Sequence, residues 1–239
     1  MDTAKTSDFD TDHDSTSKNK LNSLRASVLG ANDGIVSVAS IVLGVAGATN
    51  NRGTIFTAGL AGLVAGAMSM AVGEYVSVSS QRDSEQAFIT KEKRDLKQNP
   101  VKEFEELADA YQAKGLSTKT AHLVASELTS HDVLGAHLEV EMNLSEDDLV
   151  NPMIAAISSL VAFTAGAIIP LLAIVIASQS IHLEVTVIAV LISLCVIGYA
   201  SAKVGKAPRT RAITRVVIGG ALAMLITYGI GRLFGTAIH

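Results

Sequence analysis

The sequence predicts an all-α integral membrane protein with five transmembrane helices and a cytoplasmic insert of three helices between the second and third. Its 239 residues are 49% hydrophobic, and the apolar residues are gathered into runs rather than spread along the chain. A transmembrane helix needs about 20 mostly apolar residues to cross the bilayer core. Five runs reach this length, at residues 24–48, 54–79, 152–178, 182–202 and 208–233. A long charged stretch separates the second run from the third, and it predicts the insert.

These observations divide the chain into four regions. We expect a disordered acidic tail at residues 1–20, two transmembrane helices within 21–80, the helical insert at 81–151, and three transmembrane helices within 152–239. The tail has too few apolar residues to bury and so to order itself. Its alternating aspartates resemble a calcium-binding loop, but His13 and Asn19 replace the required glycine and closing glutamate. A solvated tail is the simpler interpretation.

Proline, glycine and run length support the membrane helices. The first run is too long for the apolar part of a signal peptide, so we expect it to be retained as a helix. Pro152 and Pro208 stand at expected helix starts, and Pro170 predicts a kink in the third helix. Close helix packing is predicted by three glycine pairs at four-residue spacing, which are Gly30 with Gly34, Gly62 with Gly66, and Gly231 with Gly235.

The positions of Lys and Arg predict the orientation, because cytoplasmic ends of membrane helices are enriched in these residues. Only Arg52 and Arg232 lie near the opposite ends. The N-terminus and residues 81–151 are therefore expected in the cytoplasm and the C-terminus outside. We expect a prokaryotic cell membrane, with a vacuolar membrane as the alternative. The basic residues at the expected cytoplasmic ends are Lys18, Lys20, Arg25, Arg82, Lys91, Lys93, Arg94, Lys203, Lys206, Arg209 and Arg211.

The insert is strongly acidic, with 15 Asp and Glu against eight Lys and Arg over residues 81–150, so nucleic acid is not an expected partner. Asn99-Pro100 and Gly115 divide it into predicted helices at 81–97, 101–113 and 117–142. The first of these is expected to continue from the second membrane helix. An apolar stripe on the second predicts a core-facing side, formed by Phe104, Leu107, Ala108 and Tyr111. A stripe on the third is formed by Glu127, His131, Leu134, Leu138 and Glu141.

Enzyme chemistry has no support in the sequence. Gly205-Lys206-Ala207 lacks the hydroxyl residue and leading glycine of a phosphate-binding loop. No nucleophile, base and orienting group stand at a persuasive spacing. His122 and His182 are interpreted as surface residues without partners, and Cys195 as a buried, inert thiol.

Two acidic residues, Asp33 and Glu74, lie inside predicted membrane helices, where each costs about 2.5 to 3.5 kcal/mol at the centre of an isolated helix. Asp33 and Met70 each stand about nine residues from the cytoplasmic end of their helix, so they have similar depth and can face each other. Glu74 lies one turn nearer the cytoplasm than Met70. A carboxylate with a thioether suits a borderline transition metal. The alternatives are a hydrogen bond from Asn32 or Ser37 to Asp33, and ordinary packing of Met70.

The insert offers oxygen ligands for a divalent metal in helical pairs. Glu92 with Asp95 and Glu103 with Glu106 are spaced at i, i+3, and His137 shares a face with Glu141 at i, i+4. The alternative is a solvated, charged surface. Carboxylates inside a membrane can exchange a bound proton for a cation, so a proton gradient is the expected energy source.

The chain resembles the vacuolar iron transporter family from about residue 24 to the C-terminus. Two motifs form the resemblance: Leu-Arg-Ala-Ser-Val-Leu-Gly-Ala-Asn-Asp-Gly at 24–34 and Gly-Ala-Met-Ser-Met-Ala-Val-Gly-Glu-Tyr at 66–75. It implies a five-helix membrane domain with a cytoplasmic metal-binding domain, assembled as a homodimer with the pathway near the two-fold axis. It also implies exchange of Fe²⁺ for protons, with Mn²⁺ as a second metal.

The resemblance implies a membrane metal site at Asp33 and Met70. The implied cytoplasmic site consists of Glu92, Glu103, Glu106 and Glu141, and Asp95 stands where eukaryotic members have glutamate. Gly62 replaces a glutamate of those members, and Glu74 replaces a glycine. His137 and Leu138 stand where their metal-binding methionines are found.

The sequence therefore predicts a proton-coupled exporter of divalent metal from the cytoplasm, with no prosthetic group. Fe²⁺ is the expected cargo, with Mn²⁺, Zn²⁺ and Co²⁺ as alternatives. A membrane-anchored metal sensor or scaffold that does not transport is the alternative function. The predicted metal-binding residues are Asp33, Met70, Glu74, Glu92, Asp95, Glu103, Glu106, His137 and Glu141.

Overall fold

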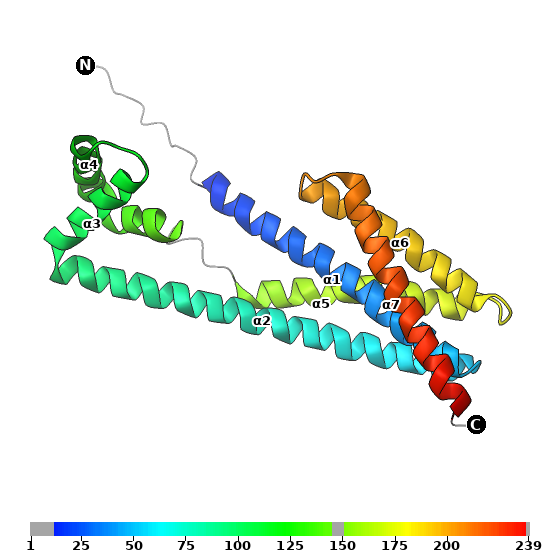
Figure 1. The fold of residues 1–239 in the computed structure, drawn as a ribbon. Coiled ribbons are helices and arrows are strands. Elements are labelled where there is room, and N and C mark those ends of the chain that lie inside the picture. The colour runs from blue at the N-terminus through cyan, green and yellow to red at the C-terminus, as the bar shows by residue number, and fades with distance from the viewer. Residues whose placement is uncertain (1–11, 145–150, 238–239) are drawn as a thin grey trace, which may run out of the picture. The chain divides into compact units, whose positions relative to one another are not determined.

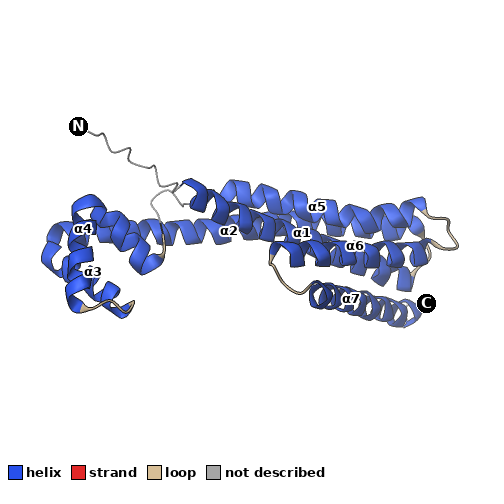
Figure 2. Cartoon of the chain, turned by 90° about the horizontal axis from the view of Figure 1, so that it is seen from above, coloured by secondary structure: helices blue, strands red, loops and turns tan. Residues whose placement is uncertain are grey.

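The computed structural model describes residues 12–144 and 151–237, with side chains from 26–144 and 151–235, and these residues form helices and connecting loops (Figures 1 and 2). The all-α class is confirmed. Five helices are long and apolar enough to cross a membrane, as predicted. In chain order the elements are α1 (Asp12–Ala48), α2 (Arg52–Gln98), α3 (Pro100–Ala113), α4 (Thr118–His137), the π-helix η1 (Leu138–Met142), α5 (Pro152–Ile176), α6 (His182–Val204) and α7 (Arg209–Ala237).

The helix ends follow local sequence, with one difference at the N-terminus. α1 is already helical at Asp12, the first described residue, and not only from near residue 24, because no Gly or Pro lies between Asp12 and the apolar run and extending a helix costs less than starting one. Residues 1–11 of the predicted tail lie outside the described residues. α5 starts at Pro152, and Pro208 accepts the first backbone bond of α7, from Ala212 N at 3.2 Å. α5 continues through Pro170 as one helix.

The chain divides into two compact units. One consists of residues 20–76 and 152–239, and the other of residues 1–19 and 77–151. The long helix α2 contributes its first part to one unit and its last part to the other.

In the unit of residues 20–76 and 152–239, α1 takes part in two apolar clusters. The first joins α1 to α2 and α5, and the second joins α1 to α6 and α7. α1 therefore supplies both cores of this unit. Buried residues of the first cluster include Val38, Val42, Ile55, Phe163 and Ile174, and those of the second include Ile35, Leu43, Val190, Leu194 and Met224.

Glycines let these helices approach closely, as their spacing predicted. A side chain added at Gly34 of α1 would overlap the Phe163 carbonyl of α5, and one at Gly231 of α7 would overlap the Gly44 carbonyl of α1. Backbone contact of this kind leaves no room for a Cβ, which explains the small residues.

Two side chains in this unit differ from the predictions. His182 is 5% exposed and its Nδ1 lies 2.6 Å from the Gln179 carbonyl oxygen, so the prediction of a surface residue was wrong. A carbonyl of the loop before α6 therefore contacts the ring nitrogen. Cys195 is exposed on α6, so the prediction of a buried thiol was also wrong, because it lies on the outward side of the helix.

In the unit that contains α3 and α4, the predicted stripe of α3 is confirmed. Leu107 and Ala108 are fully buried against Ala125 and Ala136 of α4, and Phe104 and Tyr111 pack beside them. His122 of α4 has a partner, contrary to the prediction, because its Nε2 lies 3.1 Å from Glu105 Oε2 across the α3–α4 contact.

The third predicted helix of the insert is not continuous. Asp132 has φ −153° and ψ 89°, outside the helical region, and its Oδ1 accepts the backbone N–H of Gly135 at 3.0 Å. This is the bonding of a helix N-cap, so a new helical segment starts after Asp132. The predicted stripe was therefore wrong: Glu127 and His131 are exposed, whereas Leu138 beyond the kink is fully buried.

Candidate metal site

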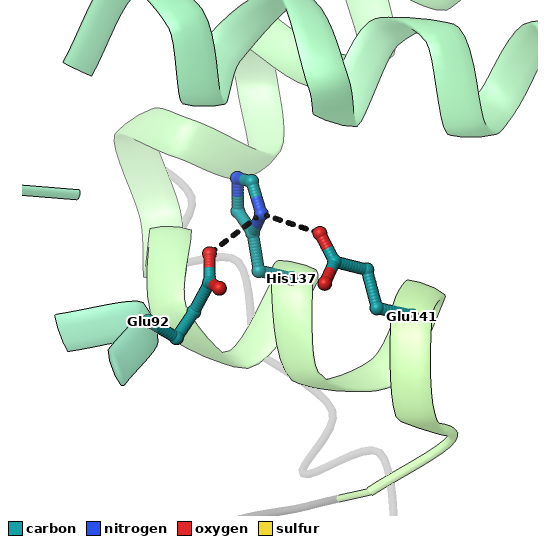
Figure 3. Close-up of side chains that lie close together, drawn as sticks. All are labelled: Glu92, His137 and Glu141. Carbon is teal, nitrogen blue, oxygen red and sulfur yellow. Dashed lines mark hydrogen bonds and ion pairs between the residues drawn. The ribbon is translucent and has the colours of Figure 1, made fainter. Parts of the chain in front are cut away.

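Three side chains converge in the insert: Glu92 from the last part of α2, His137 from the end of α4, and Glu141 from η1 (Figure 3). One ligand atom from each lies within 4.8 Å of the others. His137 Nδ1 is 3.0 Å from Glu92 Oε1 and 3.4 Å from Glu141 Oε1. Figure 3 shows that this nitrogen points towards both carboxylates and that the other ring nitrogen points away.

The local fold explains this convergence. The cap at Asp132 sets the direction of the short segment that ends at His137, and η1 then carries Glu141 four residues further along. Leu138 is fully buried at the start of η1. π-Helical turns inside α-helices are frequent at functional sites, because they re-aim side chains.

The site is largely shielded from solvent. His137 is 0% exposed and Glu92 3%, whereas the Glu141 side chain is 33% exposed. Glu92 Oε1 is close to His137 Nδ1, yet the alignment does not make a hydrogen bond, and this buried oxygen has no hydrogen-bond partner among the described residues. A buried polar atom without a partner costs about 1 to 3 kcal/mol. A cation between the three groups would remove that cost.

The electrostatics of the carboxylates also favour a cation. Burial raises the pKa of Glu92, and the negative charge of Glu141 raises it further. Burial likewise raises the pKa of Glu103, with the charge of Glu106 adding to the rise. A bound divalent metal would stabilise the ionised forms and displace their protons.

The other predicted residues of the insert are placed differently. Glu103 is buried and its charge acts on Glu92, so it belongs to the surroundings of the site. Glu106 is exposed and lies 2.6 Å from Lys102 Nζ, an ion pair that lowers the pKa of Glu106. Asp95 lies beside two cations, 3.6 Å from Lys91 Nζ and 3.2 Å from Arg94 Nε.

The unit of residues 20–76 and 152–239 contains the apolar helices and is called the membrane unit below. In it, Asp33 of α1 is half-buried and its Oδ1 accepts a hydrogen bond from Ser37 Oγ at 2.8 Å. This is one of the alternatives considered from sequence. Met70 of α2 packs against the first apolar cluster, and Glu74 is half-buried. No hydrogen bond or ion pair of the described residues links Asp33 with Met70 or Glu74. The facing arrangement of Asp33 and Met70 stays a prediction.

Asp132 is the residue that the sequence interpretation missed. Among the described residues it has no hydrogen bond or ion pair with Glu92, His137 or Glu141, but it starts the segment that presents His137. The available signal was an Asp three residues before Gly135 within a helical pattern, which is the spacing of an N-cap to its bonded amide.

A family model described as the VIT family matches residues 24–232, which is most of the chain. The chain belongs to the VIT family. A vacuolar iron transporter of Acanthamoeba castellanii is 42% identical over 214 residues, covering 89% of this chain and 79% of that protein. Vacuolar iron transporter homolog 2 of Arabidopsis thaliana is 35% identical over 213 residues, covering 89% of this chain and 84% of that protein. The homolog 2 of Oryza sativa subsp. japonica is 37% identical over 217 residues, covering 90% and 93%.

Membership of the VIT family agrees with the five apolar helices: the chain is a multi-pass membrane protein of a transporter family, and not of an enzyme family. The family match spans both motifs from which the resemblance was stated and also the insert with Glu92, His137 and Glu141.

Proposed function

We propose that this chain transports ferrous iron out of the cytoplasm in exchange for protons, with manganese as a second cargo. The observation that carries the proposal is the cluster of Glu92, His137 and Glu141 in a VIT family chain. Its Glu92 is buried, has a raised pKa, and bears an oxygen with no hydrogen-bond partner among the described residues. The printed names of its relatives support iron as the cargo.

In the proposed capture step, Glu92, His137 and Glu141 bind the metal directly, and Glu103 adds negative charge beside them. Asp95 and Glu106 attract metal to the surface by exchanging their present cations for it. Two carboxylates and one imidazole suit borderline divalent ions. The printed names of the relatives favour Fe²⁺ as the first cargo, and Mn²⁺, Zn²⁺ and Co²⁺ are further ions that this donor set accommodates.

In the proposed transport step, Asp33 and Met70 form the mid-membrane site and Glu74 passes metal to it. Metal binding releases protons from these carboxylates, and reprotonation on the other side releases the metal. In this proposal residues 81–151 form the metal-binding domain, and these residues and the N-terminus lie in the cytoplasm. The proposed assembly is a homodimer in a prokaryotic cell membrane, with a vacuolar membrane as the alternative.

Flux through reconstituted vesicles tests the membrane site. Full-length protein in liposomes is supplied with Fe²⁺ under anaerobic conditions, and internal iron is followed for wild type, Asp33→Ala and the exposed-site control Glu127→Gln. We expect Asp33→Ala to lose uptake and Glu127→Gln to keep it. Undiminished uptake by Asp33→Ala would remove Asp33 from the pathway. Metal binding without any flux in the wild type would favour the sensor or scaffold function instead.

A further inference from the structure

A strongly basic surface lies where α6 ends and α7 begins, in the membrane unit. Five cations occupy this turn within 13 positions, and all are exposed: Lys203, Lys206, Arg209, Arg211 and Arg215. No Asp or Glu follows Glu184 in the sequence. Among the described residues, none of the five forms an ion pair. The turn is therefore a positive patch that no acidic side chain of the described residues pairs with.

The fold holds these cations together tightly. Ala202 and Ala212 are buried, and Gly198 of α6 lies so close to Ile213 of α7 that a side chain would meet its Cα. Lys206 has a φ of 49°, and Ala207 N donates to the Ala202 carbonyl at 3.0 Å across it. This bond closes a Schellman-type helix end, whose left-handed position favours glycine. The chain has Lys206 at this position instead of glycine, so its positive charge is placed here at a cost in backbone conformational energy.

An apolar stripe leads along α6 to this patch. Ile188, Ile192 and Val196 are all more than half exposed at four-residue spacing, and Tyr199 follows at 43%. The Arg209 guanidinium lies over the Tyr199 ring, 5.2 Å from its centre. Such a ring is typical of the membrane interface. Along α6 the exposed side chains are therefore first apolar, as lipid acyl chains require, then the aromatic ring of Tyr199, and then the cation of Lys203.

We propose that this surface, the α6–α7 basic patch, binds an anionic phospholipid. The acyl chains lie along Ile192, Val196 and Tyr199, and the phosphate and anionic headgroup contact Lys203, Lys206 and Arg209. Clusters of four to eight cations beside a membrane helix recognise anionic lipid in this way. The apolar stripe selects a lipid over free phosphate, because soluble phosphate gains nothing from it. The alternative is that these cations only set the orientation of the helices in the membrane. That role would require neither Lys206 at a left-handed backbone position nor Arg209 over the Tyr199 ring.

The test titrates purified full-length protein in neutral detergent with phosphatidylglycerol or phosphatidylcholine of the same acyl chains, and counts bound lipid by native mass spectrometry. Wild type should prefer phosphatidylglycerol. Lys206→Gly and Arg209→Gln should each weaken that binding about fivefold, since each cation near an anionic lipid contributes about that factor. Lys119→Gln removes an exposed cation of the insert and serves as the matched control.

Lys206→Gly separates binding from folding, because glycine is favoured at that position and the variant should unfold at the wild-type temperature or above. Equal binding of the two lipids overturns the proposal, and so does an equal loss in Lys119→Gln. A third result would also overturn the proposal: inorganic phosphate raises the melting temperature of the protein as much as phosphatidylglycerol does. The ligand is then not a lipid. None of these outcomes depends on metal transport.

Discussion

At the scale of single residues, His137 is the side chain on which the candidate site depends. It is fully buried, and the same nitrogen faces carboxylates that come from two different elements, α2 and η1. Without a cation, the Glu92 carboxylate is poorly solvated and lies near a second carboxylate, that of Glu141. Both conditions disfavour its ionised form and so raise the pKa of Glu92. Charge balance, and not packing alone, therefore determines what this region binds.

Replacing His137 with alanine should weaken divalent metal binding by about tenfold or more, because a lost bond to a charged partner is worth about 1.5 to 3 kcal/mol. Binding of Co²⁺, an air-stable probe, to the full-length protein in detergent measures this by calorimetry. Glu127→Gln should bind as wild type does, since Glu127 is exposed and outside the cluster. Unchanged affinity in His137→Ala would exclude this nitrogen as a ligand.

The raised pKa values of Glu92 and Glu103 predict a pH dependence of stability. The folded protein holds these protons above the ordinary value of 4.5, so it binds more protons than the unfolded chain does. Without metal, their contribution to the free energy of unfolding is full below that value and is lost as pH rises through the raised values. Glu106, whose pKa is lowered, contributes the opposite slope at more acidic pH.

Melting temperatures in the presence of a chelator measure this effect as pH rises from about 4.5. Glu92→Gln should flatten the fall, because the amide does not titrate. Added divalent metal should raise the melting temperature more at neutral pH than at acidic pH, because protons compete with metal. An identical slope in wild type and Glu92→Gln contradicts the assignment.

At the scale of elements, the end of α4 decides whether the ligands meet. The break at Asp132 and the π-helix η1 together direct His137 and Glu141 towards α2. An uninterrupted helix over residues 117–142 would have placed Glu127 and His131 on the same stripe as Glu141, as the sequence interpretation assumed. The irregular backbone thus explains which acidic residues of the insert form the site.

Asp132→Ala should remove the cap on Gly135 and cost about 1 kcal/mol of stability. It should also weaken metal binding, although Asp132 is not one of the three ligands. Asp132→Asn keeps a capping oxygen without the charge, so it should restore both properties. A variant Asp132→Asn as defective as Asp132→Ala would show that the charge matters and the cap does not. Thermal unfolding and Co²⁺ calorimetry provide both readouts.

Sequence predicted the regular elements well, because length and hydropathy alone determine which segments can span a bilayer. The three side chains that converge, Glu92, His137 and Glu141, are among the residues predicted to bind metal, and their binding of metal stays a prediction. Sequence did not predict which acidic residues of the insert converge on His137 and which form ion pairs with lysines instead. Whether Asp95 pairs with Lys91 and Glu106 with Lys102 depends on side-chain conformations that spacing does not reveal. The break at Asp132 had only a local signal, an Asp three residues before Gly135, and the surrounding helical pattern obscured it.

At the scale of the whole molecule, α1 connects the apolar clusters of the membrane unit and also bears Asp33. Its contacts with α5 and α7 are close backbone approaches at glycines, so the position of α1 has little freedom. The residue proposed for the mid-membrane site therefore stands on a helix that is closely packed on two sides. A precise site requires such a support.

Gly34→Ala should destabilise the protein by about 1 to 3 kcal/mol, because the new methyl group overlaps the Phe163 carbonyl. Gly219→Ala on α7 is the matched control, since nothing among the described residues lies within 4 Å of its added Cβ. Thermal unfolding of purified protein compares the two. Equal stability of both variants would mean that α1 and α5 do not pack as closely as described.

Metal transport coupled to protons is tested by following both ions in one experiment. Wild-type protein is reconstituted in liposomes with an acidic interior and a pH reporter inside, and Fe²⁺ is added outside under anaerobic conditions. We expect internal iron to rise while protons leave the vesicle, and we expect uptake to slow when the pH gradient is collapsed. Iron uptake with no accompanying proton movement contradicts the coupling, and metal binding with no uptake contradicts transport.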